Sequence, residues 1–155
     1  MNKTIRWIAA IAVIIIIGIQ FIRPGKDNPP INPSMTIEAQ ADFKPPVSNL
    51  IKTSCFDCHS NETRWPWYSY VAPVSWFVAD DVKNGRDHLN FSEWGTYTTS
   101  KKVLKLGQIY EQVSKSEMPL SQYLYIHADA RLTSADRDSI VSWTEDETDK
   151  LSGGN

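Results

Sequence analysis

Residues 55–59, "CFDCH", constrain this chain more than any other feature. They contain Cys55 and Cys58, the only two cysteines among its 155 residues, and His59 follows directly. Cysteines with this spacing occur in redox-active disulfides, in zinc sites and in covalent haem attachments. Each of these sites needs a different setting, so the remaining sequence has to decide between them.

Two of the three alternatives lack the residues they need. A thioredoxin-like pair lies between a strand and a helix, with its reactive cysteine at the helix N-terminus, and no strand pattern precedes Cys55. A zinc site needs two further ligands. The other histidines, His88 and His127, are 39 residues apart, whereas a compact finger has a spacing of about three to five. The sequence therefore disfavours both sites.

A covalent haem requires nothing beyond the pentapeptide. Two thiols on one helical turn can form thioethers with the two vinyl groups of a porphyrin, and the following imidazole can then bind the iron as its proximal ligand. We therefore expect one haem c per chain, attached through Cys55 and Cys58 and ligated by His59.

The N-terminal region contains the apolar run "WIAAIAVIIIIGIQFI" over residues 7–22, which has no polar face and follows Lys3 and Arg6. The first Ala-x-Ala site, Ala39–Ala41, lies too far on for a cleaved signal peptide. We predict that residues 1–23 form an uncleaved signal anchor with one transmembrane helix. The preceding positive charge places the N-terminus in the cytoplasm and the body in the periplasm, as a single-pass protein of the inner membrane.

The region after residue 26 carries 12 basic and 18 acidic residues. This acidic balance argues against nucleic acid as a partner, since binding to a polyanion depends on clustered Lys and Arg. Residues 24–43 are rich in proline, which predicts an extended, disordered linker. Residues 44–151 then form one haem-binding, cytochrome c-like domain.

The domain has helical periodicity throughout, which predicts an all-α fold. Pro45 and Pro46 open a first helix that ends at "CFDCH". Pro73 opens a second, and Gly85 is placed to end it. A third begins at Ser100 as N-cap.

The last predicted helix begins with a capping box formed by Thr133 and Asp136, and it directs Ile140 and Trp143 inward. The domain also has an unusual number of tryptophans, which as a group suit a broad, flat ligand. These are Trp65, Trp67, Trp76, Trp94 and Trp143.

The sixth iron ligand has three candidates. Met118 stands in "SEMPL", where a methionine followed by proline after a helix is typical of small cytochromes c, and we predict it as the distal ligand. His127 is the alternative, and His88 is expected at the surface. A second histidine would give a lower potential than methionine. Arg64 and Arg86 could each bond a haem propionate, because a guanidinium fits a carboxylate with two parallel hydrogen bonds.

Three stretches also resemble a known family: "CHSNETRWPWYSYVAPVSW", "DVKNGRDHLNFSEW" and "EMPLSQYLYIHADARLT". They are similar to the small haem-binding domain of bacterial c-type cytochromes, over residues 49–143, with SNxTxWPWYS and LNFSEW as the specific motifs. The resemblance implies an exported haem protein. By position, Cys55, Cys58 and His59 match the attachment motif of the family, and Met118 matches its methionine segment.

We expect an electron carrier and not an enzyme, with no small-molecule substrate. It would be a membrane-anchored, mono-haem cytochrome that passes single electrons to redox partner proteins at or near the membrane. The alternative is a haem-based peroxidase or small-gas sensor with an open sixth position, in which His88 or His127 would act as donor or base. A third possibility is that haem only stabilises an interaction module.

Overall fold

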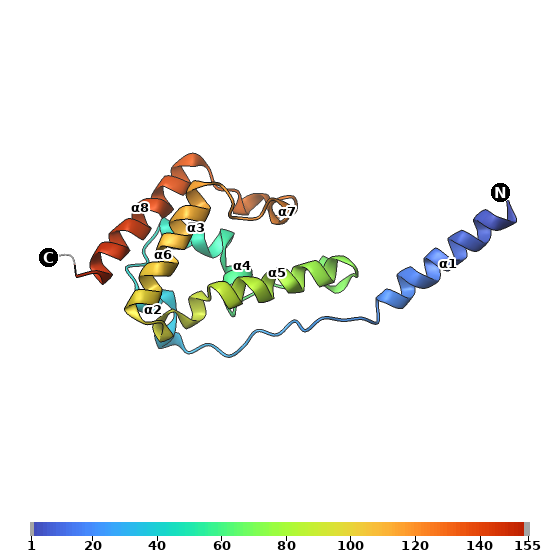
Figure 1. Cartoon of the computed structure of the whole chain (residues 1–155), viewed down its shortest axis with the longest axis horizontal. Coiled ribbons are helices and arrows are strands. Elements are labelled where there is room, and N and C mark those ends of the chain that lie inside the picture. The colour runs from blue at the N-terminus through green and yellow to red at the C-terminus, as the bar shows by residue number, and fades with distance from the viewer. Residues whose placement is uncertain (1, 154–155) are drawn as a thin grey trace.

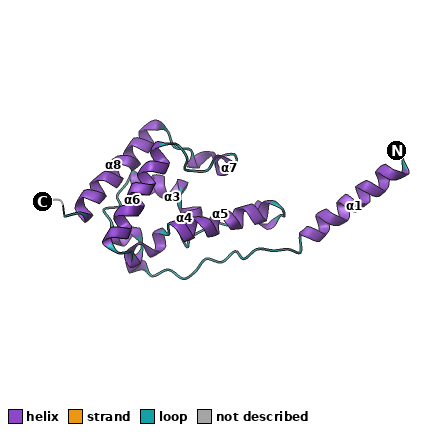
Figure 2. Cartoon of the chain, in the orientation of Figure 1, coloured by secondary structure: helices purple, strands orange, loops and turns teal. Residues whose placement is uncertain are grey.

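The structure is a computed structural model that describes residues 2–153, and this part of the chain contains no strand, which confirms the all-α prediction (Figure 2). The α-helices are α1 Lys3–Ile19, α2 Ile37–Gln40, α3 Val47–Ser54, α4 Phe56–His59, α5 Val74–His88, α6 Thr99–Ser114, α7 Ser121–Leu124 and α8 Ser134–Leu151. Short 3-10 helices are η1 Pro33–Met35, η2 Trp67–Tyr70, η3 Phe91–Thr96 and η4 Ala128–Ala130.

The long helices α6 and α8 form the main pair, and α3 packs across α8 (Figure 1). Their apolar faces meet in a core that includes Leu106 of α6 and Ile140 of α8, both fully buried. Trp143 is buried as well, so the inward direction predicted for Ile140 and Trp143 is confirmed. Phe56 of α4 stacks on Phe91, which extends this core to the helix that contains Cys58 and follows Cys55.

The predicted helix starts are confirmed in three of four cases. α3 and α5 each follow a proline, and α8 begins with the Thr133–Asp136 capping box. The exception is α6, whose N-cap is Thr98 and not Ser100. Thr98 takes this position because its hydroxyl accepts a hydrogen bond from the backbone N–H of Lys101, at 3.3 Å.

Gly85 does not end α5, which continues to His88. This glycine instead allows a close contact between α5 and α4. A Cβ atom at position 85 would lie 2.5 Å from the backbone oxygen of Cys58. Only a residue without a side chain therefore lets α5 lie directly against α4.

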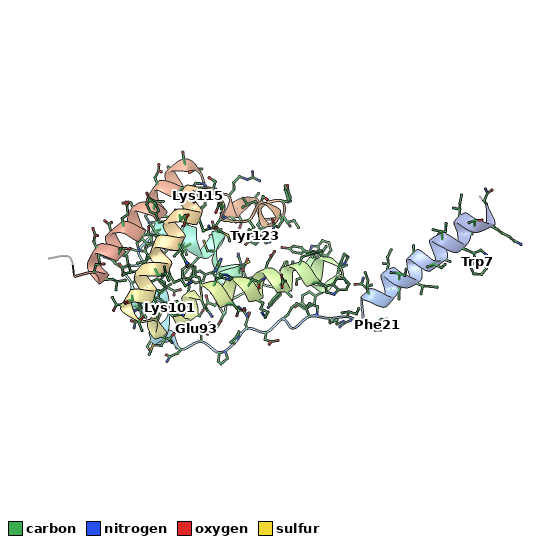
Figure 3. The ribbon with its side chains drawn as sticks, viewed as in Figure 1. Trp7, Phe21, Glu93, Lys101, Lys115 and Tyr123 are labelled. Atoms are coloured by element: carbon green, nitrogen blue, oxygen red, sulfur yellow. The ribbon has the colours of Figure 1, made fainter. Side chains whose placement is uncertain are left out.

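The N-terminal helix α1 stands apart from the domain, and its apolar side chains, from Trp7 onward, project into open space (Figure 3). It has 17 residues, which rise about 26 Å, less than the roughly 30 Å of a bilayer's hydrocarbon core. Across residues 2–153, no helix has both the length and the apolar character needed to cross a membrane. The predicted transmembrane helix is therefore not found.

Residues 20–32, here called the strap, run beside α5 in an extended conformation (Figure 1). Within the predicted disordered linker, residues 24–43, Lys26 donates to the carbonyl of Ser69 at 2.7 Å and Asn28 donates to the carbonyl of Thr63 at 2.9 Å. The residues just before the linker are fixed as well. The side-chain amide of Gln20 donates to the carbonyl of Ala72 at 3.1 Å and accepts from its N–H at 2.9 Å. The indole N–H of Trp76 donates to the carbonyl of Ile22 at 2.8 Å.

The residues just after the strap are part of the core. Ile37 of α2 is fully buried, and Phe43 packs edge-on against Trp143 with ring centroids 5.6 Å apart. Residues within the range predicted as a linker therefore contribute to the packing of the domain.

Candidate functional site

Cys58 and His59 lie on α4, and Cys55 is the residue that joins α3 to α4. The N–H of Cys55 donates to the carbonyl of Ile51 at the end of α3, and the N–H of His59 donates to the carbonyl of Cys55 at 2.9 Å. This continuous helical turn places both sulfurs and the imidazole on the wall of one cavity of about 970 Å³. The sequence predicted this arrangement because it depends only on local spacing.

Neither cysteine forms a disulfide. Burial raises the pKa of Cys55 and of Cys58 to about 12. A redox-active or zinc-binding cysteine reacts as a thiolate, which such an environment disfavours. Within the described part of the chain, no group of three or more His, Cys, Asp or Glu side chains could hold a metal ion. The structure thus gives no support to the redox and zinc alternatives.

His59 is held by two backbone carbonyls. Its Nδ1 lies 3.0 Å from the oxygen of Gly85 and 3.1 Å from that of Leu89. Carbonyls only accept, so Nδ1 carries the ring proton and Nε2 is left with its lone pair. Burial also lowers the pKa of His59, which favours the neutral form that a metal requires. The imidazole is therefore prepared to bind iron through Nε2.

A polar network keeps the loop after His59 in place. The side-chain amide of Asn90 donates to the side-chain oxygen of Asn61 at 2.9 Å, and the hydroxyl of Ser92 accepts from the N–H of Asn61 at 2.9 Å. All three side chains are buried. These residues belong to the two sequence motifs SNxTxWPWYS and LNFSEW, so those motifs frame His59.

The cavity walls are mainly apolar. They come from α5, α6 and the segment around α7, with Val74, Phe77, Val78, Val82, Ile109, Val113, Pro119, Leu120 and Ile126. The volume lies in the range of roughly 300–1,000 Å³ that is usual for ligand and cofactor sites. Two thiols, one neutral imidazole and apolar walls are the set of groups that a covalently bound porphyrin needs, so the residues present fit a haem.

The tryptophans do not line this cavity, contrary to the prediction. Of the residues described, those on its wall include tyrosine and phenylalanine but none of the five tryptophans of the domain. Trp94 and Trp143 are buried in the core, and Trp65 and Trp76 line a second hollow beside the strap. Their large apolar surfaces stabilise the packing of the polypeptide itself.

Met118 and His127 both reach the cavity, and they differ in what else they contact. The backbone of Met118 is fixed, because its carbonyl accepts from Nη1 of Arg137 at 2.9 Å. His127 is hydrogen-bonded through Nε2 to the hydroxyl of Tyr68, and it stacks on Tyr123 with centroids 4.1 Å apart. The Nε2 atom of His127 is therefore already occupied by a hydrogen bond.

The two arginines that could bond propionates have other partners. Arg64 lines the cavity, but its Nε and Nη2 donate to the two carboxylate oxygens of Asp57 at 3.2 and 3.1 Å. The hydroxyl of Tyr123, a residue of α7 that is labelled in Figure 3, donates to the same carboxylate at 2.9 Å. Hydrogen bonds and charge from Asp57 raise the pKa of Arg64.

Arg86 lies outside the cavity wall and points to the strap. Its guanidinium donates to the carbonyl of Asp27 at 2.7 Å, to the side chain of Asn28 at 2.8 Å, to the carbonyl of Ser60 at 2.8 Å and to the hydroxyl of Thr63 at 2.7 Å. The propionate contact considered for Arg86 therefore has no support in the structure. Its place is between the strap and the loop after His59.

Sequence reasoning missed three polar residues of the cavity wall: Asn84 of α5 and Lys105 and Gln108 of α6. His88, which was considered as an iron ligand and expected at the surface, is exposed and also lines the cavity. The ammonium of Lys105 donates to the amide oxygen of Gln108 at 2.9 Å, and its charge acts on His59. Asn84 lies in a stretch that resembles the family, but no motif marks Lys105 or Gln108, because α5 and α6 meet at the cavity only through the tertiary fold.

Comparison with known proteins agrees with this geometry. A family model described as a haem-binding domain matches residues 14–146, more than half of the chain. This match confirms the resemblance found in the sequence. Neither the comparison with curated proteins nor the comparison with solved structures found a match.

Proposed function

The chain belongs to the haem-binding domain family, and from this premise we propose that it is a mono-haem c-type cytochrome that transfers single electrons. The observation that carries the proposal is the position of His59. Its Nδ1 is held by the carbonyls of Gly85 and Leu89 beside two cysteines on one helical turn. A haem bound there supplies an iron that can change its oxidation state by one electron.

The residues of the chain have separate roles in this proposal. Cys55 and Cys58 hold the porphyrin edge through thioethers, and His59 binds the iron with the lone pair of Nε2. The apolar side chains of α5 and α6 exclude water from the cavity, which disfavours the more highly charged oxidised state and so raises the potential.

Met118 is the proposed sixth ligand. It lines the cavity on a fixed segment, whereas the Nε2 atom of His127 is already paired with Tyr68. Met118→Ala should remove the sulfur-to-iron absorption band of the oxidised protein and lower the potential, while His127→Ala should leave that band in place. If the unsubstituted protein lacks this band, or if Met118→Ala retains it, the ligand assignment is wrong.

The covalent attachment can be tested by optical spectroscopy. The pyridine complex of the denatured protein should show two thioether links, Cys55→Ala or Cys58→Ala should each leave one, and the double variant should bind haem without a covalent link. If the unsubstituted protein is colourless, with both thiols open to alkylation, the proposal fails.

One observation favours a second candidate, a gas sensor or peroxidase. The Tyr68–His127 pair lines the cavity and could donate a hydrogen bond to a small ligand on the iron. Binding of carbon monoxide by the native protein, together with a high-spin ferric spectrum, would favour this candidate over electron transfer.

For location, we propose the periplasm, with α1 attached to a membrane and redox proteins as partners. What supports this is the apolar surface of α1, whose large side chains are exposed around the helix, such as Trp7 at 69%. Water is a poor environment for such a surface. The protein should sediment with membranes and be released by detergent but not by salt.

A further inference from the structure

An exposed apolar surface lies at the end of the domain nearest α1, and the proposed function does not use it. We call it the aromatic rim and define it as Phe21, Ile22, Trp67, Tyr70, Val71 and Tyr125. Trp67 is 78% exposed and Tyr125 83%. These side chains do not line the haem cavity, so a bound porphyrin would leave them exposed.

Three separate segments of the chain meet in this rim. The hydrogen bond between Tyr68 and His127 joins η2 to the segment after α7. The bonds of Gln20 with Ala72 and of Trp76 with Ile22 join the strap to the start of α5. Figure 1 shows α7, the start of α5 and the end of α1 at the same end of the domain. The rim is therefore continuous with α1.

The composition of the rim fits a phospholipid surface. Tryptophan and tyrosine prefer the headgroup layer, where the ring is in an apolar region and the polar atom is in contact with water. Two cations lie beside them: Arg23, which is exposed, and Lys26, whose ammonium is 3.5 Å from the centre of the Tyr70 ring. Positive charge next to aromatic side chains favours anionic lipids.

We propose that the aromatic rim docks the haem domain onto the headgroup layer of a bilayer to which α1 is attached. This inference rests on the membrane attachment in the proposed function. It has a consequence for electron transfer, because Phe77 and Ile126 are exposed and line the cavity. Ile126 directly follows Tyr125 of the rim, and Phe77 follows Trp76, which is bonded to the strap. This part of the cavity wall then lies near the membrane, where a redox partner would approach.

Single-cysteine variants of the full-length holoprotein test the docking. In the holoprotein Cys55 and Cys58 are consumed as thioethers, so an introduced cysteine is the one available thiol. The variants are Trp67→Cys and Tyr125→Cys in the rim, Trp7→Cys in α1, and Tyr110→Cys as an exposed control on α6. Each is labelled with a charged maleimide that does not cross membranes, in detergent and in vesicles of phosphatidylethanolamine and phosphatidylglycerol.

We expect labelling at positions 67 and 125 to slow severalfold in vesicles, relative to position 110. Suppose that positions 67 and 125 are labelled as fast as position 110 while position 7 is protected from the maleimide. Then α1 is attached to the bilayer but the rim does not dock, and the inference is overturned. Free labelling at position 7 would instead contradict the membrane attachment, and labelling of the unsubstituted protein would contradict the thioether links. If the rim positions are also labelled slowly in detergent, without vesicles, a protein contact covers the rim, and the inference is overturned as well.

Discussion

At the scale of single residues, the site depends on a glycine. Gly85 brings α5 close enough to α4 for its carbonyl to accept from the ring of His59 at 3.0 Å. Because a Cβ atom here would lie 2.5 Å from the oxygen of Cys58, Gly85→Ala must push the two helices apart. We expect the free energy of unfolding to fall by about 1–3 kcal/mol and the haem content per chain to decrease.

Gly107→Ala is the matched control, since Gly107 lies in α6 and a Cβ atom there has nothing within 4 Å. This substitution should keep or raise stability, by up to about 1 kcal/mol. Denaturant unfolding and the ratio of haem to protein absorbance measure both effects. Equal losses of stability and haem content in the two variants would show that the contact of Gly85 with α4 has no special effect.

Lys105 offers a way to change the charge on the wall of the cavity. Its ammonium lies on the cavity wall, and a positive charge near the iron favours the reduced, less positive state. Lys105→Gln should therefore lower the reduction potential, as measured by redox titration. Lys101→Gln, at an exposed position of the same helix, should change it much less; a similar shift in both variants would rule out a local effect.

At the scale of elements, the strap depends on Arg86. Its four hydrogen bonds join the strap to the loop after His59. Arg86→Lys keeps the charge but loses the planar fork of donors. We expect limited proteolysis between residues 24 and 32 to become several times faster. Lys83→Ala removes an exposed ion pair with Asp87 on the same helix and should leave the cleavage rate unchanged; a matching increase there would contradict this role of Arg86.

The start of α8 depends on its capping box. Thr133→Ala removes the hydroxyl that caps the helix, which typically costs about 1 kcal/mol. Hydrogen bonds from Thr133 lower the pKa of Asp136. A lowered folded-state pKa stabilises the fold at neutral pH, and this contribution is lost as the pH falls through the acid range.

The stability difference between Thr133→Ala and the unsubstituted protein should therefore shrink when thermal unfolding is measured in acid. Ser139→Ala, in the middle of α8, serves as the control and should show no such dependence on pH. If the difference for Thr133→Ala is the same in acid as at neutral pH, the ionised Asp136 takes no part in the cap.

At the scale of the whole molecule, the cavity divides the domain into two parts. α3, α6 and α8 share an apolar core, whereas α5 and the α7 segment face α6 across a cavity of about 970 Å³. Without haem, α5 and α7 lose apolar contacts on this side. In the double variant Cys55→Ala/Cys58→Ala prepared free of haem, hydrogen exchange should become faster in α5 and α7, while α6 and α8 stay protected. Equal exchange in all four helices would contradict this division.

The sequence by itself determined the local features. The CxxCH pentapeptide, the proline starts of α3 and α5 and the capping box of α8 depend on residues within one or two helical turns, so their spacing alone predicts them. The all-α fold follows from the same helical periodicity. The SNxTxWPWYS and LNFSEW motifs also identified the family, although not what the motifs do.

Only the tertiary structure decided which distant groups meet. It brings the carbonyls of Gly85 and Leu89 within hydrogen-bond distance of His59, and it pairs Arg64 with Asp57. It also directs Arg86 toward the strap and places the tryptophans away from the cavity. A side chain of a given type can satisfy its hydrogen bonds or bury its apolar surface in many places. The choice among them depends on how the helices pack, and the spacing of residues along the chain does not specify it.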